Sequence, residues 1–369
     1  MISKSKVKEE IDKITPVEIS SDDTYEFSTW IPKEETLPFR SPVLNMYLTN
    51  NPEAGVFLGR AIRFIGENSS GKSALSLDIL AFACEQKHLD NYNLIYIDKE
   101  DGMDVNIGKR YGSKVENRIK VISGDMCPDS IESFFSFVRR ETSKNPCIIV
   151  NDSIDSYVSK KLLNLSIEND SLIAEGKDVK EPQMMINAKA LSEEWKFTNP
   201  ILSRSKSVLI NISQTRTTTD KFMKDARFNA SAGSSTKFFE SFRFGVRQGS
   251  LINRKDAFGN ERTVGYQTIV KILKNRASGY SGIEETMFLY TSKGFIVEEE
   301  IIDFLINISG TIKSAGAYLS CPELFGDTKL FKKNAIKILI TDNEVRNKAI
   351  SLIKRDWKII KKSVEEDLF

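Results

Sequence analysis

The chain has 369 residues, of which 40% are hydrophobic, and a formal net charge of +2. That length and apolar content can supply a full core for one large domain with appendages or for two domains, and the small net charge excludes a uniformly basic nucleic-acid coat. Four cysteines lie far apart without a C-x-x-C pair, which favours neither a zinc site nor a disulfide framework, and the single histidine, His88, argues against Ser-His-Asp chemistry.

No membrane or secretory segment is predicted. The first ten residues, MISKSKVKEE, lack the apolar core of a signal peptide, and no apolar run approaches the length of a membrane span. Because the cysteine pattern also suits a reducing compartment, we expect a cytoplasmic protein without a membrane partner.

Residues 1–40 are predicted to form an N-terminal arm, assigned to oligomerisation. Residues 1–35 carry nine Asp and Glu against five Lys and Arg, and they include an aromatic cluster at Tyr25, Phe27 and Trp30. These rings either dock on a neighbouring subunit or cover the chain's own core, and the sequence leaves both open. A short helix is expected over residues 44–48.

A phosphate-binding loop is the most specific feature of the chain. Alternating apolar residues at 61–65 predict a strand, the motif G-x-x-x-x-G-K-S follows at 66–73, and apolar periodicity over 75–83 predicts a helix. Backbone amides of such a loop wrap a phosphate chain at the positive end of the new helix, while the lysine meets the outer phosphates and the serine hydroxyl binds Mg²⁺. The strand before and the helix after argue against a chance match on a surface turn. The predicted nucleotide-binding residues are Gly66, Glu67, Asn68, Ser69, Ser70, Gly71, Lys72, Ser73 and Ala74.

Strands and helices alternate after this loop, which predicts a doubly wound α/β fold with a mostly parallel sheet. The run at 147–150 is apolar throughout, as is typical of a strand buried on both faces. Later strands follow one another without helices, so we expect the sheet to finish antiparallel. The expected strands are 94–97, 119–122, 147–150, 208–212, 242–247, 266–273 and 286–290, and the expected helices are 105–111, 130–143 and 183–203.

Polar residues follow three of these strands at their carboxyl ends, where a doubly wound sheet binds its ligands. Glu100 is placed to orient and deprotonate an attacking water, Asp152 suits the magnesium-side carboxylate of a Walker B element, and an amide at Gln214 can sense the γ-phosphate. Each of them taken alone also fits a helix cap or a loop. Four strand ends in order present Lys and Ser, Glu, Asp and Gln, which favours a single site.

Two polar stretches, about residues 164–182 and 215–235, are predicted to be long loops, which in a compact domain are usually functional or disordered. From 202 to 255 there are eleven Lys and Arg against three Asp and Glu. Cations interleaved with aromatic side chains suit single-stranded nucleic acid, because phosphates pair with cations and bases stack on rings. The alternative is an ordinary solvated loop. The predicted DNA-binding residues are Arg216, Lys221, Phe222, Lys224, Arg227 and Phe228.

Residues 301–369 are predicted to be a small helical region. Over 311–362 it carries twelve Lys and Arg against five Asp and Glu. A basic face of that kind either gathers duplex DNA or belongs to a solvated helix pair, and composition leaves both open.

The chain resembles the RecA-type recombinases, including the shorter phage forms such as UvsX, over residues 41–295 in consistent order. GENSSGKS resembles the family's phosphate loop, YIDKEDGMD the strand that ends in its catalytic glutamate, and IIVNDSID its Walker B strand. LINISQTR resembles the strand of the sensor glutamine, and STKFFESFRFGVRQ the segment after the second DNA-binding loop. VKILKNRASG resembles the strand whose two basic residues reach the neighbouring protomer's nucleotide.

This resemblance implies a RecA-like ATPase core at 41–300. Asp104 would contact the adenine, and Lys274 and Arg276 would act across the subunit boundary; the alternative for this basic pair is DNA phosphates or a solvated edge. Ile107 stands where the family has an adenine-stacking tyrosine, which leaves the base selectivity open. The implied catalytic residues are Lys72, Glu100, Gln214, Lys274 and Arg276, and the implied metal ligands are Ser73 and Asp152.

The implied activity is that of a DNA-dependent ATPase that uses ATP and Mg²⁺ and forms helical filaments on single-stranded DNA. It would catalyse homologous pairing and strand exchange with double-stranded DNA in recombination and repair, in a bacterial cytoplasm or a phage-infected cell. A single-strand-binding protein and a loading mediator are further candidate partners.

The sequence leaves two alternatives to this activity open. One is a hexameric helicase or translocase with the same core, for which residues 1–40 are too short an N-terminal domain. The other is a non-catalytic DNA-binding filament or mediator, against which intact Lys72, Glu100 and Asp152 argue.

Overall fold

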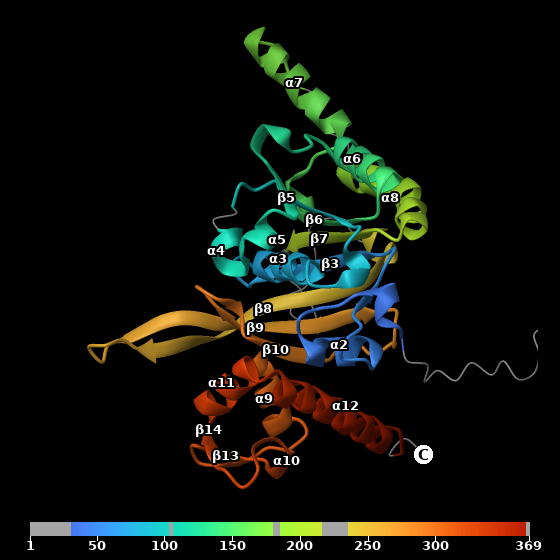
Figure 1. Cartoon of the computed structure of the whole chain (residues 1–369). Helices are drawn as coiled ribbons and strands as arrows, with labels where there is room; N and C mark the ends of the chain where they lie inside the picture. The colour runs from blue at the N-terminus through green and yellow to red at the C-terminus, as the bar shows by residue number, and fades with distance from the viewer. Residues whose placement is uncertain (1–30, 103–105, 180–184, 216–234, 367–369) are drawn as a thin grey trace, which may run out of the picture. The chain divides into compact units, whose positions relative to one another are not determined.

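A nine-stranded sheet organises the chain (Figure 1). The computed structural model describes residues 31–102, 106–179, 185–215 and 235–366, and these belong to one compact unit. Within them, no helix is both long enough and apolar enough to cross a membrane.

Six neighbouring strands of the sheet are parallel. The strand order is β11-β10-β9-β8-β3-β7-β6-β4-β5, and the parallel part runs from β8 to β5. β3 lies between β7 and β8, so the loop after β3 opens at the carboxyl edge of the parallel strands, beside the end of β7. The parallel strands are β3 (Ala61–Gly66), β4 (Asn93–Asp98), β5 (Ile119–Ser123), β6 (Cys147–Asp152), β7 (Val208–Gln214) and β8 (Glu240–Lys255).

The other three strands of this sheet pair antiparallel, which confirms the predicted doubly wound core with an antiparallel extension. One detail differs from the prediction, because β8 is still parallel to β3 and the antiparallel part begins only at β9. β8 and β9 are also longer than expected, and Figure 1 shows their far halves as a hairpin that reaches beyond the sheet. The antiparallel strands are β9 (Glu261–Asn275), β10 (Glu284–Tyr290) and β11 (Gly294–Phe295).

Helices cover both faces of the parallel part. Side chains of α3 join one hydrophobic cluster with alternate residues of the strands, while α6 and α8 form a second cluster on the other face. At the centre of the second cluster, the fully buried ring of Trp195 meets the ring of Phe135 at 5.1 Å and stacks on that of Phe239 at 6.1 Å. The α-helices are α3 (Lys72–Ala83), α4 (Ile107–Tyr111), α5 (Ser113–Glu116), α6 (Ile131–Lys144), α7 (Lys160–Ala174) and α8 (Ile186–Ser205), and the short 3-10 turns are η2 (Lys87–Leu89), η3 (Gly124–Met126), η4 (Ile154–Ser156) and η6 (Ser235–Phe238).

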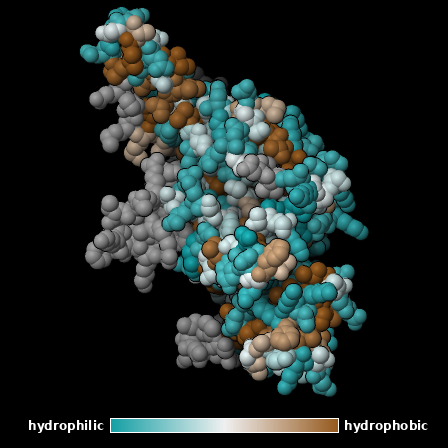
Figure 2. All heavy atoms as spheres, turned by 90° about the vertical axis from the view of Figure 1, so that its left-hand side faces the viewer, coloured by the Kyte–Doolittle hydropathy of each residue, from teal (hydrophilic) through white to brown (hydrophobic). Residues whose placement is uncertain are grey.

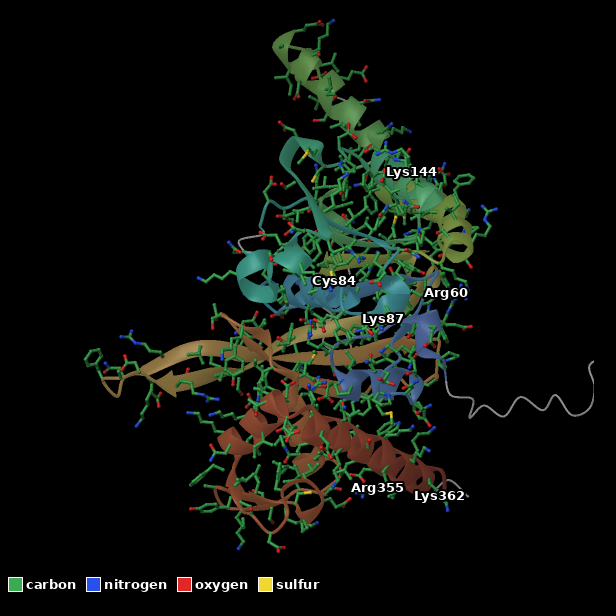
Figure 3. All side chains as sticks on the ribbon, in the orientation of Figure 1. Arg60, Cys84, Lys87, Lys144, Arg355 and Lys362 are labelled. Atoms are coloured by element: carbon green, nitrogen blue, oxygen red, sulfur yellow. The ribbon has the colours of Figure 1, made fainter. Side chains whose placement is uncertain are left out.

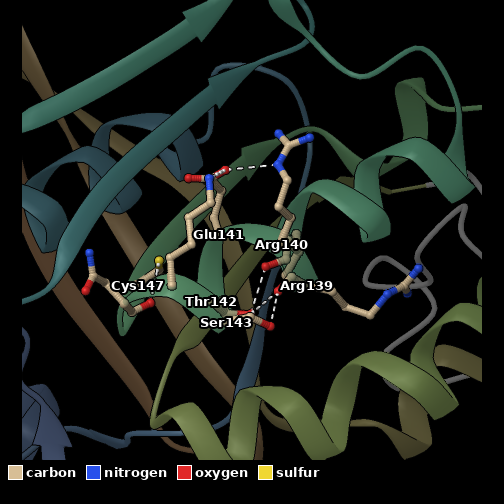
Figure 4. Close-up of polar contacts among 9 residues, drawn as sticks. Arg139, Arg140, Glu141, Thr142, Ser143 and Cys147 are labelled. Carbon is tan, nitrogen blue, oxygen red and sulfur yellow. Dashed lines mark hydrogen bonds and ion pairs between the residues drawn. The ribbon is translucent and has the colours of Figure 1, made fainter.

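The last turn of α6 is stabilised by its own polar side chains (Figure 4). The carboxylate of Glu141 forms ion pairs with Arg140 at 3.2 Å and with Lys144 at 3.1 Å. Arg139, on the same turn, reaches Glu194 of α8 at 2.5 Å. The contact of Arg139 links α6 to α8 on one face of the sheet.

α7 corrects the prediction of a loop at 164–182, because a helix occupies most of that stretch. The side chain of Ser159 caps the helix by accepting a hydrogen bond from the amide of Leu162 at 3.3 Å. No residue of α7 is buried, and Figure 2 shows hydrophobic side chains on this helix at the top of the view. Ile167 and Ile173 are 59% and 62% exposed. The polar composition therefore marked a solvent-exposed helix, followed by a shorter connection.

The end of the predicted N-terminal arm belongs to the core. Phe39 is buried, and its ring meets the rings of Phe64 at 6.5 Å and Phe244 at 5.6 Å. The first thirty residues of the arm lie outside the described residues. The elements before β3 are η1 (Lys33–Glu35), β1 (Thr36–Leu37), α2 (Pro42–Thr49) and β2 (Val56–Phe57).

The C-terminal region was predicted to be helical. It contains helices and, in addition, a three-stranded antiparallel sheet. It packs on α2 through Trp357, whose indole N–H donates to Oδ1 of Asn50 at 3.0 Å and whose ring lies 4.9 Å from that of Tyr47. Its elements are α9 (Val297–Asn307), β12 (Lys313–Ala315), β13 (Tyr318–Ser320), α10 (Pro322–Phe325), β14 (Leu330–Phe331), α11 (Lys332–Thr341) and α12 (Asn343–Glu366).

Candidate active site

The phosphate-binding loop turns from β3 into α3 and needs both of its glycines. A Cβ on Gly66 would lie 2.0 Å from the carbonyl oxygen of Val246 on β8. Gly71 has φ +98°, in the left-handed region that favours glycine, and it precedes the first turn of α3. Because of this turn, the unpaired amides at the start of α3 face the loop, which is the arrangement that binds phosphate.

Lys72 lies within the loop. Its Nζ donates to the carbonyl oxygens of Gly66 at 2.9 Å and Glu67 at 2.6 Å, and the residue is 7% exposed. Burial lowers the pKa of Lys72, whereas the carboxylates of Asp152 and Glu100 raise it. An ammonium held in this position can meet the outer phosphate of a bound nucleotide.

A hydroxyl and a carboxylate meet beside the loop. Ser73 Oγ donates to Oδ2 of Asp152 at 2.5 Å, and the hydroxyl of Tyr96 donates to the same oxygen at 2.8 Å. Burial raises the pKa of Asp152, and the hydrogen bonds from Ser73 and Tyr96 lower it.

The oxygens of Ser73 and Asp152 fit Mg²⁺, a hard cation that takes oxygen ligands and usually combines one or two protein groups with substrate phosphates. Across the described part of the chain, no group of three or more His, Cys, Asp or Glu residues could hold a metal ion. The hydroxyl and the carboxylate would therefore share Mg²⁺ with the phosphates, where the ion neutralises charge that develops during phosphoryl transfer.

Glu100 is held by side chains that follow β6 and β7. Its Oε1 accepts hydrogen bonds from Ser153, from Ser156 at 3.2 Å and from Nε2 of Gln214 at 3.4 Å. The main-chain N–H of Gln214 donates to Oδ2 of Asp155 at 2.8 Å. The side-chain amide of the candidate sensor therefore donates directly to the carboxylate of the candidate base, so a movement of Gln214 changes the hydrogen bonding of Glu100.

Two cavities flank the phosphate loop. The first, of about 280 Å³, joins the loop to Tyr96, Glu100, Asp152 and Gln214. The second, also of about 280 Å³, lies toward β9 and β10, and its lining outside the loop is Arg110, Tyr266, Leu289 and Thr291. The first cavity has the carboxylates that phosphate chemistry needs, while an aromatic and apolar wall beside the loop suits a nucleotide base.

The basic pair, Lys274 and Arg276, lies toward the amino ends of the parallel strands. In the strand pairing, Gly66 of β3 lies opposite Val246 of β8. Lys274 of β9 lies opposite Arg243 of β8, which in turn lies opposite Arg63 of β3. Arg63 and Gly66 are three residues apart along β3, which corresponds to about 10 Å, and the phosphate loop extends further away from Lys274. The basic pair is therefore remote from the chain's own phosphate loop.

Some predicted site residues lie outside the described residues. These are Asp104 and the six DNA-binding candidates of the second loop, Arg216, Lys221, Phe222, Lys224, Arg227 and Phe228. Their assignments remain predictions.

Sequence reasoning missed several polar residues of the site. Tyr96 reads as an ordinary apolar strand residue, although its hydroxyl reaches Asp152. Ser153 and Ser156 stand directly after the Walker B strand, and their position there was the available signal for a role beside Glu100. Arg110 and Tyr266 come from distant parts of the chain, and only the fold brings them to the loop.

A strand, a phosphate loop and a helix, with carboxylates at the next strand ends, define a P-loop nucleoside triphosphatase with a doubly wound core. A model of the RecA N-terminal domain matches residues 53–295. The chain belongs to the RecA family, and it is therefore an ATP-binding and DNA-binding protein of DNA recombination and repair.

Relatives named Protein RecA align over most of the chain. The protein of Helicobacter acinonychis is 27% identical over 302 residues, covering 81% of this chain and 78% of its own. That of Helicobacter hepaticus is 28% identical over 292 residues, covering 79% and 75%. That of Chlorobaculum parvum is 29% identical over 294 residues, covering 78% and 75%. The similarity thus covers more of this chain than the residues 53–295 that the family model matches.

Proposed function

We propose that the chain forms helical filaments on single-stranded DNA and catalyses homologous pairing and strand exchange, using ATP and Mg²⁺. The observation that carries this proposal is the separation of the cations. Lys72 lies in the chain's own phosphate loop, whereas Lys274 and Arg276 lie toward the amino ends of the parallel strands, away from that loop. A site that needs both sets is complete only where like subunits stack head to tail, and such a contact generates a ring or an open helix.

The chemistry follows from the residues around the first cavity. Glu100 takes a proton from the attacking water, while Ser153 and Gln214 keep its carboxylate oriented. Lys72 and the neighbour's basic pair stabilise charge on the γ-phosphate oxygens. Because the basic pair comes from another subunit, hydrolysis waits for assembly on DNA.

Finer features of the proposal concern the base and the partners. The adenine occupies the second cavity, near Arg110 and Tyr266. The protein acts in the cytoplasm, with homologous double-stranded DNA as the second substrate. A single-strand-binding protein and a loading mediator are further proposed partners.

The test of assembly is electron microscopy of the full chain with single-stranded DNA and a non-hydrolysable ATP analogue. Open helical filaments on the DNA are expected. Closed rings would favour a hexameric helicase of the same core, and free monomers with bound nucleotide would refute assembly altogether.

Replacing Glu100 by glutamine is expected to separate hydrolysis from binding. The amide oxygen still accepts the hydrogen bonds of Ser153 and Ser156, but it cannot take a proton from water, so the ATP turnover should fall by about 10²–10⁴-fold. DNA binding with ATP, measured by fluorescence anisotropy, should remain at the wild-type level. Joint loss of turnover and DNA binding would assign Glu100 to structure instead of catalysis.

Removing the cations of the second loop is expected to weaken single-strand binding and to flatten its dependence on salt. Fewer neutralised phosphates release fewer counterions, so the slope of log K against log salt should shrink by roughly 0.7 per lost contact. The variant carries alanine at Arg216, Lys221, Lys224 and Arg227. The control carries alanine at four exposed lysines elsewhere, which are Lys87, Lys109, Lys114 and Lys120. An unchanged slope in the loop variant would move the DNA path elsewhere, with the basic C-terminal region first to examine.

A further inference from the structure

Glu240, the first residue of β8, lies fully buried among cations. Its carboxylate forms ion pairs with Arg63 (Nε to Oε1, 2.7 Å) and Arg243 (Nε to Oε2, 3.2 Å). Its main-chain carbonyl oxygen accepts a hydrogen bond from Nζ of Lys274 at 2.6 Å. One residue therefore contacts cations from three neighbouring strands, β3, β8 and β9.

The carbonyl oxygens just before Glu240 hold the basic pair as well. Lys237 accepts from Nζ of Lys274 at 2.8 Å, and Phe238 accepts from Nη2 of Arg276 at 3.4 Å. Both carbonyls belong to η6, which follows residues 216–234 directly in the chain. The position of the basic pair thus depends on the main chain at the start of β8.

Stability alone does not explain a carboxylate in this place. Removing an ion from water costs several kcal/mol, and well-packed apolar residues in place of a buried ion pair are often neutral or stabilising. Burial raises the pKa of Glu240, and Arg63 and Arg243 oppose that rise. Burial also lowers the pKa of Lys274, repulsion by Arg276 adds to this, and Glu240 opposes it. Glu240 therefore favours the charged form of the lysine that it holds.

We propose that Glu240 is a positioning residue for the basic pair. Its carboxylate fixes the first residue of β8 between Arg63 and Arg243, and this fixes the carbonyl oxygens that hold Lys274. Arg63 stands three residues before Gly66 on β3, so the strand that anchors Glu240 also leads into the chain's own phosphate loop. Figure 3 labels Arg60, the residue directly before β3. The inference rests on the proposed function, in which the basic pair serves the neighbouring protomer.

The first test is Glu240→Gln, which removes the charge and keeps the shape. The kcat of DNA-dependent ATP turnover is expected to fall about 10- to 100-fold, since a displacement of about 1 Å in a reacting group can cost that much. The KM for ATP should not change, because ATP is bound by the chain's own loop. The matched control is Glu284→Gln, which breaks the exposed ion pair with Arg247 on the same sheet and should leave kcat unchanged. A rise in KM equal to the fall in kcat would overturn the positioning role.

The decisive test mixes protomers. Lys72→Ala protomers lack the lysine of their own phosphate loop but supply a correctly held basic pair. Glu240→Gln protomers keep an intact phosphate loop. An excess of Lys72→Ala protomers should therefore restore the turnover per intact phosphate loop. The parallel mixture uses Lys274→Ala/Arg276→Ala protomers with Lys72→Ala. If this second mixture is restored and the first is not, the inference about Glu240 is wrong. If mixed filaments form and neither is restored, the action across the subunit boundary itself fails.

Thermal unfolding of each variant shows whether the fold survives. If Glu240→Gln does not fold, the double variant with Arg63→Gln, which removes both buried charges, takes its place in the same mixtures. If neither folds, Glu240 serves the fold and the proposal is rejected.

Discussion

Replacing Lys72 by alanine is expected to lower the ATP turnover by about 10²–10³-fold, the usual cost of removing one preorganised group from a charged transition state. Lys72 is the cation that the loop holds with the carbonyl oxygens of Gly66 and Glu67. Alanine also leaves the negative charges of Asp152 and Glu100 without this nearby ammonium, and they would repel the phosphates, so nucleotide binding should weaken as well. Steady-state phosphate release with saturating single-stranded DNA measures the effect.

The matched control for this variant is Lys87→Ala. Lys87 is an exposed lysine shortly after α3, labelled in Figure 3, and its loss should leave turnover at the wild-type value. Turnover near the wild-type value in Lys72→Ala would disprove the assigned site.

Removing the basic pair is expected to have an effect of similar or greater size. Cations supplied by a neighbouring subunit are worth factors of roughly 10³ to 10⁵ in phosphoryl transfer, so Lys274→Ala/Arg276→Ala should hydrolyse ATP at that much lower a rate. The pair lies at the amino edge of the parallel strands, away from the chain's own loop. The loss should therefore leave ATP binding by an isolated protomer intact.

Mixing distinguishes action within a protomer from action across the boundary. Lys72→Ala protomers carry an intact basic pair, and Lys274→Ala/Arg276→Ala protomers carry an intact phosphate loop. Mixed filaments should regain part of the ATPase activity that neither variant shows alone. Filaments that contain both variants and stay inactive would show that the basic pair does not act in trans.

The core of the fold could be predicted because its signals are local. The apolar run in β6 announces a strand buried on both faces, and the carboxyl ends of parallel strands share one edge. For that reason Glu100, Asp152 and Gln214 could be expected beside the loop, and the first cavity contains all three. Their chemical roles remain predictions that the variants above address.

Other parts could not be predicted, for physical reasons. α7 has no buried face, so its sequence lacks the apolar stripe that indicates a packed helix, and its polarity resembled that of a loop. The outer half of β8 is mostly exposed, with Ile252 buried in it, so the apolar pattern that marks a strand stops before the strand does. The contacts of Lys274 are with carbonyl oxygens, and main-chain acceptors leave no signature in the sequence.

The proposed function is the exchange of homologous DNA strands in an ATP-dependent filament. The most direct measurement is transfer of a fluorescent strand from a short duplex to single-stranded DNA coated with the full chain. We expect transfer that requires ATP and a homologous duplex and that is abolished in Lys72→Ala. Filaments that hydrolyse ATP yet transfer no strand, or release of the labelled strand regardless of homology, would contradict it.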